Sequence, residues 1–396
     1  MSTTRRHSPG RAANQATRWS RPTASVGRSS AADVAAALSG REGHAVVGRH
    51  DDRQRAYIGS FTAAGGAGIL TAAVDTDSGA LTVLSATDTL ADPSYLALSP
   101  SGDTLYAVSE TSDGAVAAFR LDGDKPERTG PQVLADAAAP THLALVNGHV
   151  LTANYGSGSV TVVPIRPDGT LAPAPSGVLR HTGSGPHPQR QQGPHAHEVL
   201  PDPSGRWVVS VDLGTDSVRV CALTDAGALT LHREVALRPG SGPRHLAFHP
   251  RGDRAYVLNE LAPTVTICTW DAADGALRPL GEAAVLPGPA DGDGEAHPSE
   301  VVVAPDGRFL WTATRGQDVI SVLALDEAGE RPRLTATVPC GGHWPRDLAI
   351  DPSGRFLYAA NERSGDVTWF AIDPETGIPR RAGAIEAPAA SCVIFG

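Results

Sequence analysis

Residues 242–260 read GPRHLAFHPRGDRAYVLNE and contain two short apolar runs on either side of a Pro-x-Gly turn. Such runs, separated by turn residues, are typical of a β-hairpin. Arg244 lies at the entrance to the first predicted strand, and Glu260 lies at the exit from the second. Because the two strands of a hairpin run in opposite directions, we expect both residues at the same end of the hairpin.

The same plan recurs along the chain. Four further stretches share it, SYLALSPSGDTLYAVSE, HEVLPDPSGRWVVSVDL, SEVVVAPDGRFLWTATR and RDLAIDPSGRFLYAANE, and two weaker copies are RAYIGSF and THLALVNGHVLTANY. One anchor in the second strand of each copy gives the series Tyr57, Tyr106, Leu151, Val209, Tyr256, Trp311 and Tyr358. Their spacing averages about 50 residues, which is typical of a four-stranded propeller blade.

A third alternating run follows most hairpins, as in DSVRVCAL and DVISVLAL, and a fourth segment such as GALTVLSA comes after it. Four strands repeated seven times predict an all-β fold, a seven-bladed β-propeller of four-stranded blades. The C-terminal SCVIFG has no repeat of its own. We expect it to pair with the first blade near RAYIGSF and close the ring, which removes exposed sheet edges.

The charge divides the chain into two predicted regions. Residues 1–55 carry ten Arg and four acidic residues, whereas the remainder has a net charge of −16. We predict a disordered Arg-rich tail over residues 1–54 and a propeller domain over residues 55–396. The acidic body argues against a nucleic-acid surface. No apolar run suits a membrane span, so no membrane partner is expected, and a cytoplasmic monomer is the default expectation.

Residue usage excludes several chemistries. Lys125 is the only lysine in the chain, which argues against Schiff-base and P-loop mechanisms. The four cysteines show no CxxC spacing, which fits neither a zinc knuckle nor a redox pair; Cys221 and Cys268 occupy the same place in successive repeats and are expected to be buried thiols. The chain also lacks the GxSxG elbow of serine hydrolases.

The blade geometry collects polar residues at one end of the predicted propeller, where first strands begin and second strands end. The candidates there are His195, His197, Asp212, Arg244, Glu260, His297, Arg315 and Arg346. Two insertions, at residues 181–197 and 285–300, precede first strands and are expected to overhang the same end. Ligand sites form where the loops of many repeats converge, so this end is the predicted site.

Two histidine patterns need separate interpretation. His195 and His197 would lie on one side of an extended chain, as metal ligands sometimes do. No further spacing motif supports a metal site, and no bound metal is expected. His245 and His249 are interpreted as structural residues that point elsewhere on their hairpin.

Several of these segments resemble a known family. YIGSF, GPHAHEVLPDPSGRWVVSVDLGTDSVRV, GSGPRHLAFHPRGDRAYVLNEL, HPSEVVVAPDGRFLWTATRG and PRDLAIDPSGRFLYAANE are similar to the seven-bladed propeller lactonases, which include bacterial 6-phosphogluconolactonases and fungal carboxy-cis,cis-muconate cyclases. The resemblance covers residues 57–396. It implies a cofactor-independent site made of His195 or His197, Arg244, Glu260 and Arg315. TATRG stands where many relatives have Asn-Arg-Gly, so the neighbour of Arg315 departs from the family pattern.

The resemblance implies a hydrolase that opens a small-molecule lactone, with 6-phosphogluconolactone in the pentose phosphate pathway as the favoured substrate. The alternatives are a cyclase that forms a muconate-type lactone, and a propeller that binds a ligand or protein without turnover. Lactone opening needs a base and donors for the growing oxyanion; either Glu260 or a histidine can be that base. We assign catalysis to His195, His197, Arg244 and Glu260. The predicted substrate-binding residues are Asp212, His297, Arg315 and Arg346.

Overall fold

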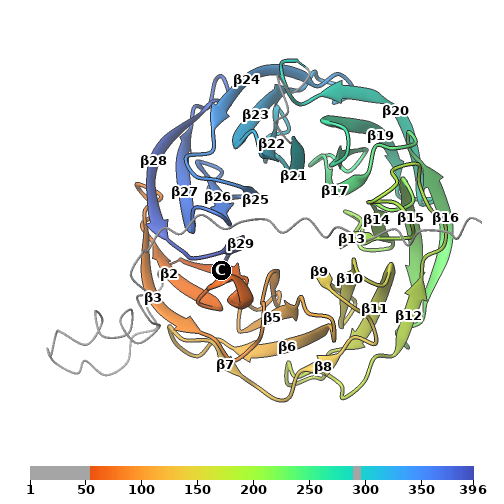
Figure 1. Ribbon diagram of the computed structural model, residues 1–396, viewed down its shortest axis with the longest axis vertical. Coiled ribbons are helices and arrows are strands. Elements are labelled where there is room, and N and C mark those ends of the chain that lie inside the picture. Colours follow the sequence, from red (N-terminus) through yellow and green to blue (C-terminus); the bar gives the residue numbers. More distant parts are fainter. Residues whose placement is uncertain (1–53, 289–295) are drawn as a thin grey trace, which may run out of the picture. The chain divides into compact units, whose positions relative to one another are not determined.

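The computed structural model describes residues 54–288 and 296–396. Residues 1–53 of the predicted tail and part of the second insertion lie outside these ranges. The described chain folds into seven antiparallel sheets arranged as blades of a propeller, and one short 3-10 helix, η1 (Thr62–Ala64), follows the first strand (Figure 1). The seven-bladed β-propeller predicted from the repeats is therefore confirmed.

Within each blade, the strands are arranged side by side from the central channel outward (Figure 1). Each group below gives the innermost strand first. The first three blades are β29 (Ala390–Phe395), β1 (Arg55–Ser60), β2 (Ile69–Val74) and β3 (Leu81–Thr87); β4 (Leu96–Leu98), β5 (Thr104–Ser109), β6 (Ala115–Arg120) and the pair β7 (Glu127–Arg128) and β8 (Val133–Leu134); and β9 (Pro140–Val146), β10 (His149–Asn154), β11 (Ser159–Pro164) and β12 (Gly177–Arg180). The other four are β13 (Ala196–Pro201), β14 (Val208–Asp212), β15 (Ser217–Leu223) and β16 (Leu229–Ala236); β17 (Pro243–Phe248), β18 (Arg254–Asn259), β19 (Thr264–Asp271) and β20 (Ala276–Ala284); β21 (His297–Val303), β22 (Phe309–Arg315), β23 (Val319–Ala324) and β24 (Arg333–Pro339); and β25 (Pro345–Ile350), β26 (Phe356–Asn361), β27 (Asp366–Ile372) and β28 (Pro379–Glu386).

Burial along the strands follows from this order. Second strands such as β5, β10 and β26 are buried at every residue, because neighbouring blades cover both of their faces. Outer strands such as β24 alternate between exposed and half-buried residues, since one face meets solvent. The continuous apolar runs of the second strands thus reflect packing between blades.

The Pro-x-Gly turns have a backbone reason for their glycine. Gly102, Gly205, Gly252, Gly307 and Gly354 occupy the same place in five repeats, and each has a φ between 71° and 74°. Glycine adopts this left-handed conformation without the steric cost that a Cβ brings. The turn residues therefore set the register between the first and second strands.

Aromatic anchors join several of the blades to the next one. The hydroxyls of Tyr106 and Tyr256 donate to the carbonyl oxygens of Gly169 and Gly329, at 2.9 Å and 2.8 Å, in the outer turn of the following blade. Trp311 Nε1 donates to the carbonyl oxygen of Gly377 at 2.7 Å in the same way. A buried aromatic ring with a satisfied polar group therefore recurs at the anchor positions.

The C-terminal strand closes the ring. β29 is antiparallel to β1, with Ala56 opposite Phe395 and Ile58 opposite Val393. Figure 1 shows β29 and the C-terminus near the centre, beside the blade that holds the first strands. The predicted closure by SCVIFG is confirmed.

Removing this closure should destabilise the whole ring. A chain that ends at Glu386 loses β29, and with it the buried side chains of Cys392 and Val393 and every hydrogen bond that β1 makes on that side. We expect such a chain to lose its cooperative thermal transition and to aggregate, because β1 becomes an open edge. Circular dichroism melting with size-exclusion chromatography measures this, and an unchanged, monodisperse transition would contradict it.

Two other sequence predictions can be compared with the described residues. Cys221, Cys268, Cys340 and Cys392 are buried and unpaired, as expected for the first two. Within 54–288 and 296–396, no helix has the length and apolar character needed to cross a membrane.

Candidate active site

A β-bulge near the start of the innermost strand turns one extra residue toward the channel in six blades. At each bulge one residue has no partner across the ladder. The bulged residues are Thr141, His197, Arg244, Ser299, Arg346 and Ser391. Equivalent residues of separate blades are thereby brought to one end of the channel.

These residues, except Ser299, line one pocket. The lining also includes Phe61, Ser94, Tyr95, Glu110 and His245. Phe61 and Glu110 follow second strands, whereas His197, Arg244 and Arg346 lie at the start of innermost strands. Strand entrances and strand exits therefore meet at the same end, as the hairpin argument predicted.

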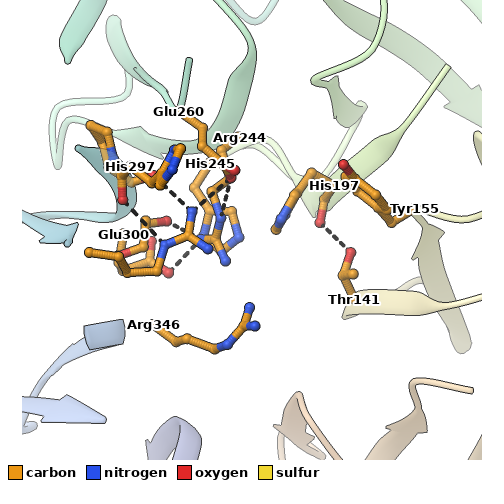
Figure 2. A network of polar contacts seen from close by, with 12 residues as sticks. Thr141, Tyr155, His197, Arg244, His245, Glu260, His297, Glu300 and Arg346 are labelled. Atoms are coloured by element: carbon orange, nitrogen blue, oxygen red, sulfur yellow. Dashed lines mark hydrogen bonds and ion pairs between the residues drawn. The ribbon is translucent and has the colours of Figure 1, made fainter. Parts of the chain in front are cut away.

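Glu260 holds three guanidinium groups beside this pocket, and Figure 2 shows one of them, that of Arg244, next to the carboxylate. Its Oε2 lies 3.2 Å from Arg244 Nε and 2.9 Å from Arg315 Nη2, and its Oε1 accepts a hydrogen bond from Arg190 Nη2 at 2.7 Å. Arg244 comes from β17, Arg315 ends β22, and Arg190 comes from the first insertion. Three cations around one carboxylate leave an excess of two positive charges.

The arginines decide the protonation state of Glu260. Burial alone would raise the pKa of its carboxyl, but Arg315, Arg244 and Arg190 outweigh burial and hold that pKa below its usual value. Burial lowers the pKa of Arg315 to about 10, which leaves the guanidinium charged at neutral pH. A carboxylate with a depressed pKa is a weak proton acceptor, so Glu260 is better suited to orienting the arginines.

The first insertion supplies a residue that the sequence analysis missed. Arg190 also donates to Tyr155 Oη at 3.2 Å. The adjacent Gln191 is fully buried, and its Nε2 donates to Asp216 Oδ1 at 2.7 Å and to the carbonyl oxygen of Leu213 at 2.8 Å. Gln191 therefore fixes the loop and lays Arg190 against Glu260. Neither residue lies on a repeated strand, so the repeat gave no signal for them.

The two histidines of the PHAH segment have different surroundings. His197 is buried and lines the pocket, where its ring points toward Arg244 and His245 in Figure 2. Burial and then Arg244 lower its pKa well below the usual value, so the imidazole is neutral at neutral pH. His195 is not among the pocket-lining residues; its ring stacks on Tyr155 at 4.4 Å, and its Nδ1 lies 2.8 Å from the carbonyl oxygen of that tyrosine. The bulge at His197 breaks the alternation that put both rings on one side.

Asp212 does not reach the pocket. Its fully buried carboxylate accepts hydrogen bonds from the backbone N of His195 at 2.9 Å and of Thr215 at 3.0 Å, and contacts His181 Nδ1 at 2.6 Å and Arg219 Nη1 at 3.3 Å. These partners make Asp212 an internal anchor of its blade. The expectation that it binds substrate is corrected accordingly.

The remaining predicted residues lie near the pocket. His297 begins β21, its carbonyl oxygen accepts from Arg315 Nε at 3.2 Å, and its ring lies edge-on to Trp344. Arg346 forms an ion pair with Glu362 and lies 4.9 Å above the Phe61 ring. Arg346 is thus a partly neutralised cation at the pocket wall.

His245 was interpreted as a structural residue that points elsewhere, yet it lines the pocket. A tetrapeptide recurring once per blade would have revealed its place: PSYL, PTHL, AHEV, PRHL, PSEV, PRDL and ASCV begin at residues 93, 140, 196, 243, 298, 345 and 390. In the six blades with a bulge, the second residue of the tetrapeptide is the bulge position, and the third follows it. Within the described ranges, no three His, Cys, Asp or Glu side chains are grouped so as to hold a metal ion.

The fold and the pocket define a β-propeller with a cationic, histidine-containing site at one end of its channel. Residues 55–395 match the family model described as Lactonase, 7-bladed beta-propeller, and the chain belongs to that family.

Several relatives are similar over most of their length. A 6-phosphogluconolactonase of Bacillus subtilis (strain 168) is 36% identical over 294 residues, which cover 73% of this chain and 83% of that protein. The solved structure of the Pseudomonas aeruginosa periplasmic gluconolactonase is 30% identical with a TM-score of 0.80, covering 86% of this chain and 98% of that one. A Lactobacillus plantarum protein structure is 30% identical with a TM-score of 0.81, covering 87% and 99%.

Proposed function

We propose that the protein is a hydrolase that opens 6-phosphogluconolactone to 6-phosphogluconate, the reaction that the sequence resemblance favoured. The observation that carries the proposal is the group of Arg190, Arg244 and Arg315 around the single carboxylate of Glu260. Its excess positive charge suits an anionic substrate and the oxyanion that forms during acyl transfer. The name of the Bacillus subtilis relative supports the same substrate.

The proposed chemistry needs no cofactor. A water molecule attacks the lactone carbonyl, and Arg244 and Arg315 stabilise the charge that develops on the carbonyl oxygen. A pocket imidazole accepts the water's proton, since His197 and His245 are neutral there whereas Glu260 has a lowered pKa. Glu260 acts as a positioning residue for the arginines.

The substrate range follows from the same charges. His297 and Arg346 lie near Arg244 and Arg315, and we propose that they contact the sugar acid or its phosphate. A phosphorylated lactone should be preferred to a neutral one, because a phosphate gains charge-assisted hydrogen bonds from guanidinium groups. A cytoplasmic location and a monomeric state remain predictions; one structural relative is a periplasmic gluconolactonase.

Turnover of three lactones tests the proposal. Acid release from 6-phosphogluconolactone, glucono-δ-lactone and a muconolactone should be followed with the uncatalysed rate subtracted. We expect kcat/KM for the phosphorylated lactone to exceed that for glucono-δ-lactone by at least about tenfold, as one lost charge-assisted contact predicts. Turnover of the muconolactone alone would favour the cyclase alternative. Thermal stabilisation by a lactone without any turnover would favour a binding platform.

A further inference from the structure

A second set of polar residues lies directly behind the pocket. In the six blades with a bulge, the residue after the bulge faces a residue of the second strand and is buried. This inner ring consists of His142, Glu198, His245, Glu300, Asp347 and Cys392. Burying three carboxyl groups and two imidazoles costs free energy unless each group has a polar partner. The contacts among them are therefore a guide to a functional role.

Three members of the inner ring form a chain of contacts that ends in the pocket. The carboxyl groups of Asp347 and Glu300 lie close enough to share a hydrogen bond, which opposes the rise that burial causes in the pKa of Glu300 and adds to that of Asp347. Two carboxyl groups can do so only when one of them carries a proton. Glu300 Oε2 lies 2.6 Å from His245 Nδ1. The two atoms are in close contact, but the angles between their groups are not those of a hydrogen bond. His245 in turn lines the pocket.

The donors around Glu300 assign the proton positions. Its Oε1 accepts from the backbone N of Val301 at 2.9 Å. Asp347 acts as the protonated partner, because burial raises its pKa well above the usual value and its hydrogen bond to Glu300 raises it further. Glu300 is then a carboxylate that accepts from Val301, from Asp347 and from Nδ1–H of His245. This tautomer leaves the lone pair of His245 on Nε2, and Nε2 has no hydrogen-bond partner among the described residues.

We propose that His245 carries the proton of the lactonase reaction and that Glu300, held by Asp347, orients its ring and stabilises its protonated form. This inference rests on the proposed function and assigns the pocket imidazole of that reaction. His197 has no comparable support, since no carboxylate pairs with its ring within the described ranges, whereas Glu300 Oε2 lies 2.6 Å from His245 Nδ1. A neutral imidazole held through one nitrogen by a carboxylate is the arrangement that makes histidine an effective base in acyl transfer.

The proton and electron balance of the step is complete. The water oxygen bonds to the carbonyl carbon while Nε2 of His245 takes a proton from the water, and the carbonyl π electrons move to the oxygen beside Arg244. When that electron pair returns, the bond from carbon to the ring oxygen breaks. The ring oxygen leaves with the bonding pair and receives the proton from Nε2. The imidazole is neutral again, and the product is the open-chain hydroxy acid.

Ionisation of Glu300 sets the expected pH dependence. The groups that face it are Arg244 and His245 from β17, Asp347 from β25, Glu198 from β13, Cys392 from β29 and Tyr95 ahead of β4. Burial raises the pKa of Glu300 to about 7, against the opposing effects of Arg244, Val301 and Asp347. Because the carboxylate is the active form, activity should fall as the pH drops below about 7.

The chain offers a matched control for this triad. His149 is a buried imidazole at the start of β10, with its Nδ1 2.9 Å from the carbonyl oxygen of Asn147. It does not line the pocket. Replacing His149 should therefore cost packing and a hydrogen bond without changing the chemistry.

Steady-state kinetics of His245→Asn and Glu300→Gln, beside the control variants His149→Asn and His149→Gln, test the inference. We expect the first two to lower kcat by about 10²-fold or more, with KM within about twofold, and Glu300→Gln to remove the acidic limb of the pH profile. The double variant should be no slower than His245→Asn alone, because the two residues act as a unit. The control variants should retain kcat within about threefold.

The outcomes separate this inference from the proposed function. A wild-type protein that turns over no lactone contradicts the proposed function itself. Wild-type turnover that His245→Asn and Glu300→Gln leave within about threefold, with an unchanged pH profile, contradicts only the triad. If either variant fails to fold, histidine nitrogen NMR of the wild-type protein decides: Nδ1–H at His245 supports the triad, and Nε2–H overturns it.

Discussion

Replacing Arg244 by alanine is expected to lower kcat/KM for 6-phosphogluconolactone by about 10³-fold, near the upper end of what loss of an oxyanion donor costs. Its guanidinium is buried at the pocket, where it contacts Glu260 at 3.2 Å and donates to the carbonyl oxygen of Ser299. The bulge in β17 fixes its position, so no neighbouring side chain can take its place. Steady-state kinetics on the purified variant give the measurement.

Two comparisons sharpen this prediction. Arg238→Ala removes a half-exposed guanidinium whose ion pair with Glu282 lies outside the pocket, and it should leave kcat/KM unchanged. Added guanidinium ion should restore part of the activity of Arg244→Ala but none of any deficit in the control. A variant without Arg244 that retains kcat/KM within about threefold of wild type would remove this arginine from the chemistry.

Glu260→Gln is expected to reduce both activity and stability. The substitution keeps the size of the side chain but leaves Arg190, Arg244 and Arg315 without their shared counter-charge, and removing one partner of a buried ion pair costs about 3–5 kcal/mol. With the arginines mispositioned, kcat should fall by about 10²-fold. Chemical denaturation and steady-state kinetics together test both effects.

The stability difference should depend on pH with a definite sign. The folded-state pKa of Glu260 is lowered, so its carboxylate stabilises the folded protein above the unfolded-state pKa of about 4.3. The gap between wild type and Glu260→Gln should therefore be full at neutral pH and shrink as the pH falls through the acid range. Glu282→Gln, which removes the partner of a single half-exposed arginine, should show little difference at any pH. A gap that widens in acid would contradict the assignment.

The repeat carries most of the information about the fold. Pro-x-Gly turns and aromatic anchors each recur in five of the seven blades, because most blades use the same tight turn and the same kind of contact with a neighbour. The pairing of SCVIFG with β1 was predictable. A C-terminal strand that belongs to no repeat of its own can pair with the first blade and so close the ring. Arg244 and Glu260 were predictable as neighbours because a hairpin brings its two ends together.

The details of the site were harder to predict for two physical reasons. Simple alternation along a strand fails at a bulge, so His195 was grouped with His197 and His245 was assigned away from the pocket. Arg190 lies in a loop whose course depends on Gln191 finding its buried acceptors, and no periodic pattern encodes that. Asp212 has the right place in its repeat, but its observed partners are Thr215 and Arg219 of its own blade and His181 and His195 of the first insertion.

A crystal structure with 6-phosphogluconate bound is the most direct test that the bulged residues of separate blades form one lactonase site. We expect the product's carboxylate within hydrogen-bond distance of Arg244 and Arg315, with a carboxylate oxygen near Nε2 of His245. The phosphate should meet Arg190 or Arg346. Product bound on the outer strands, or at the opposite end of the channel, would contradict the account.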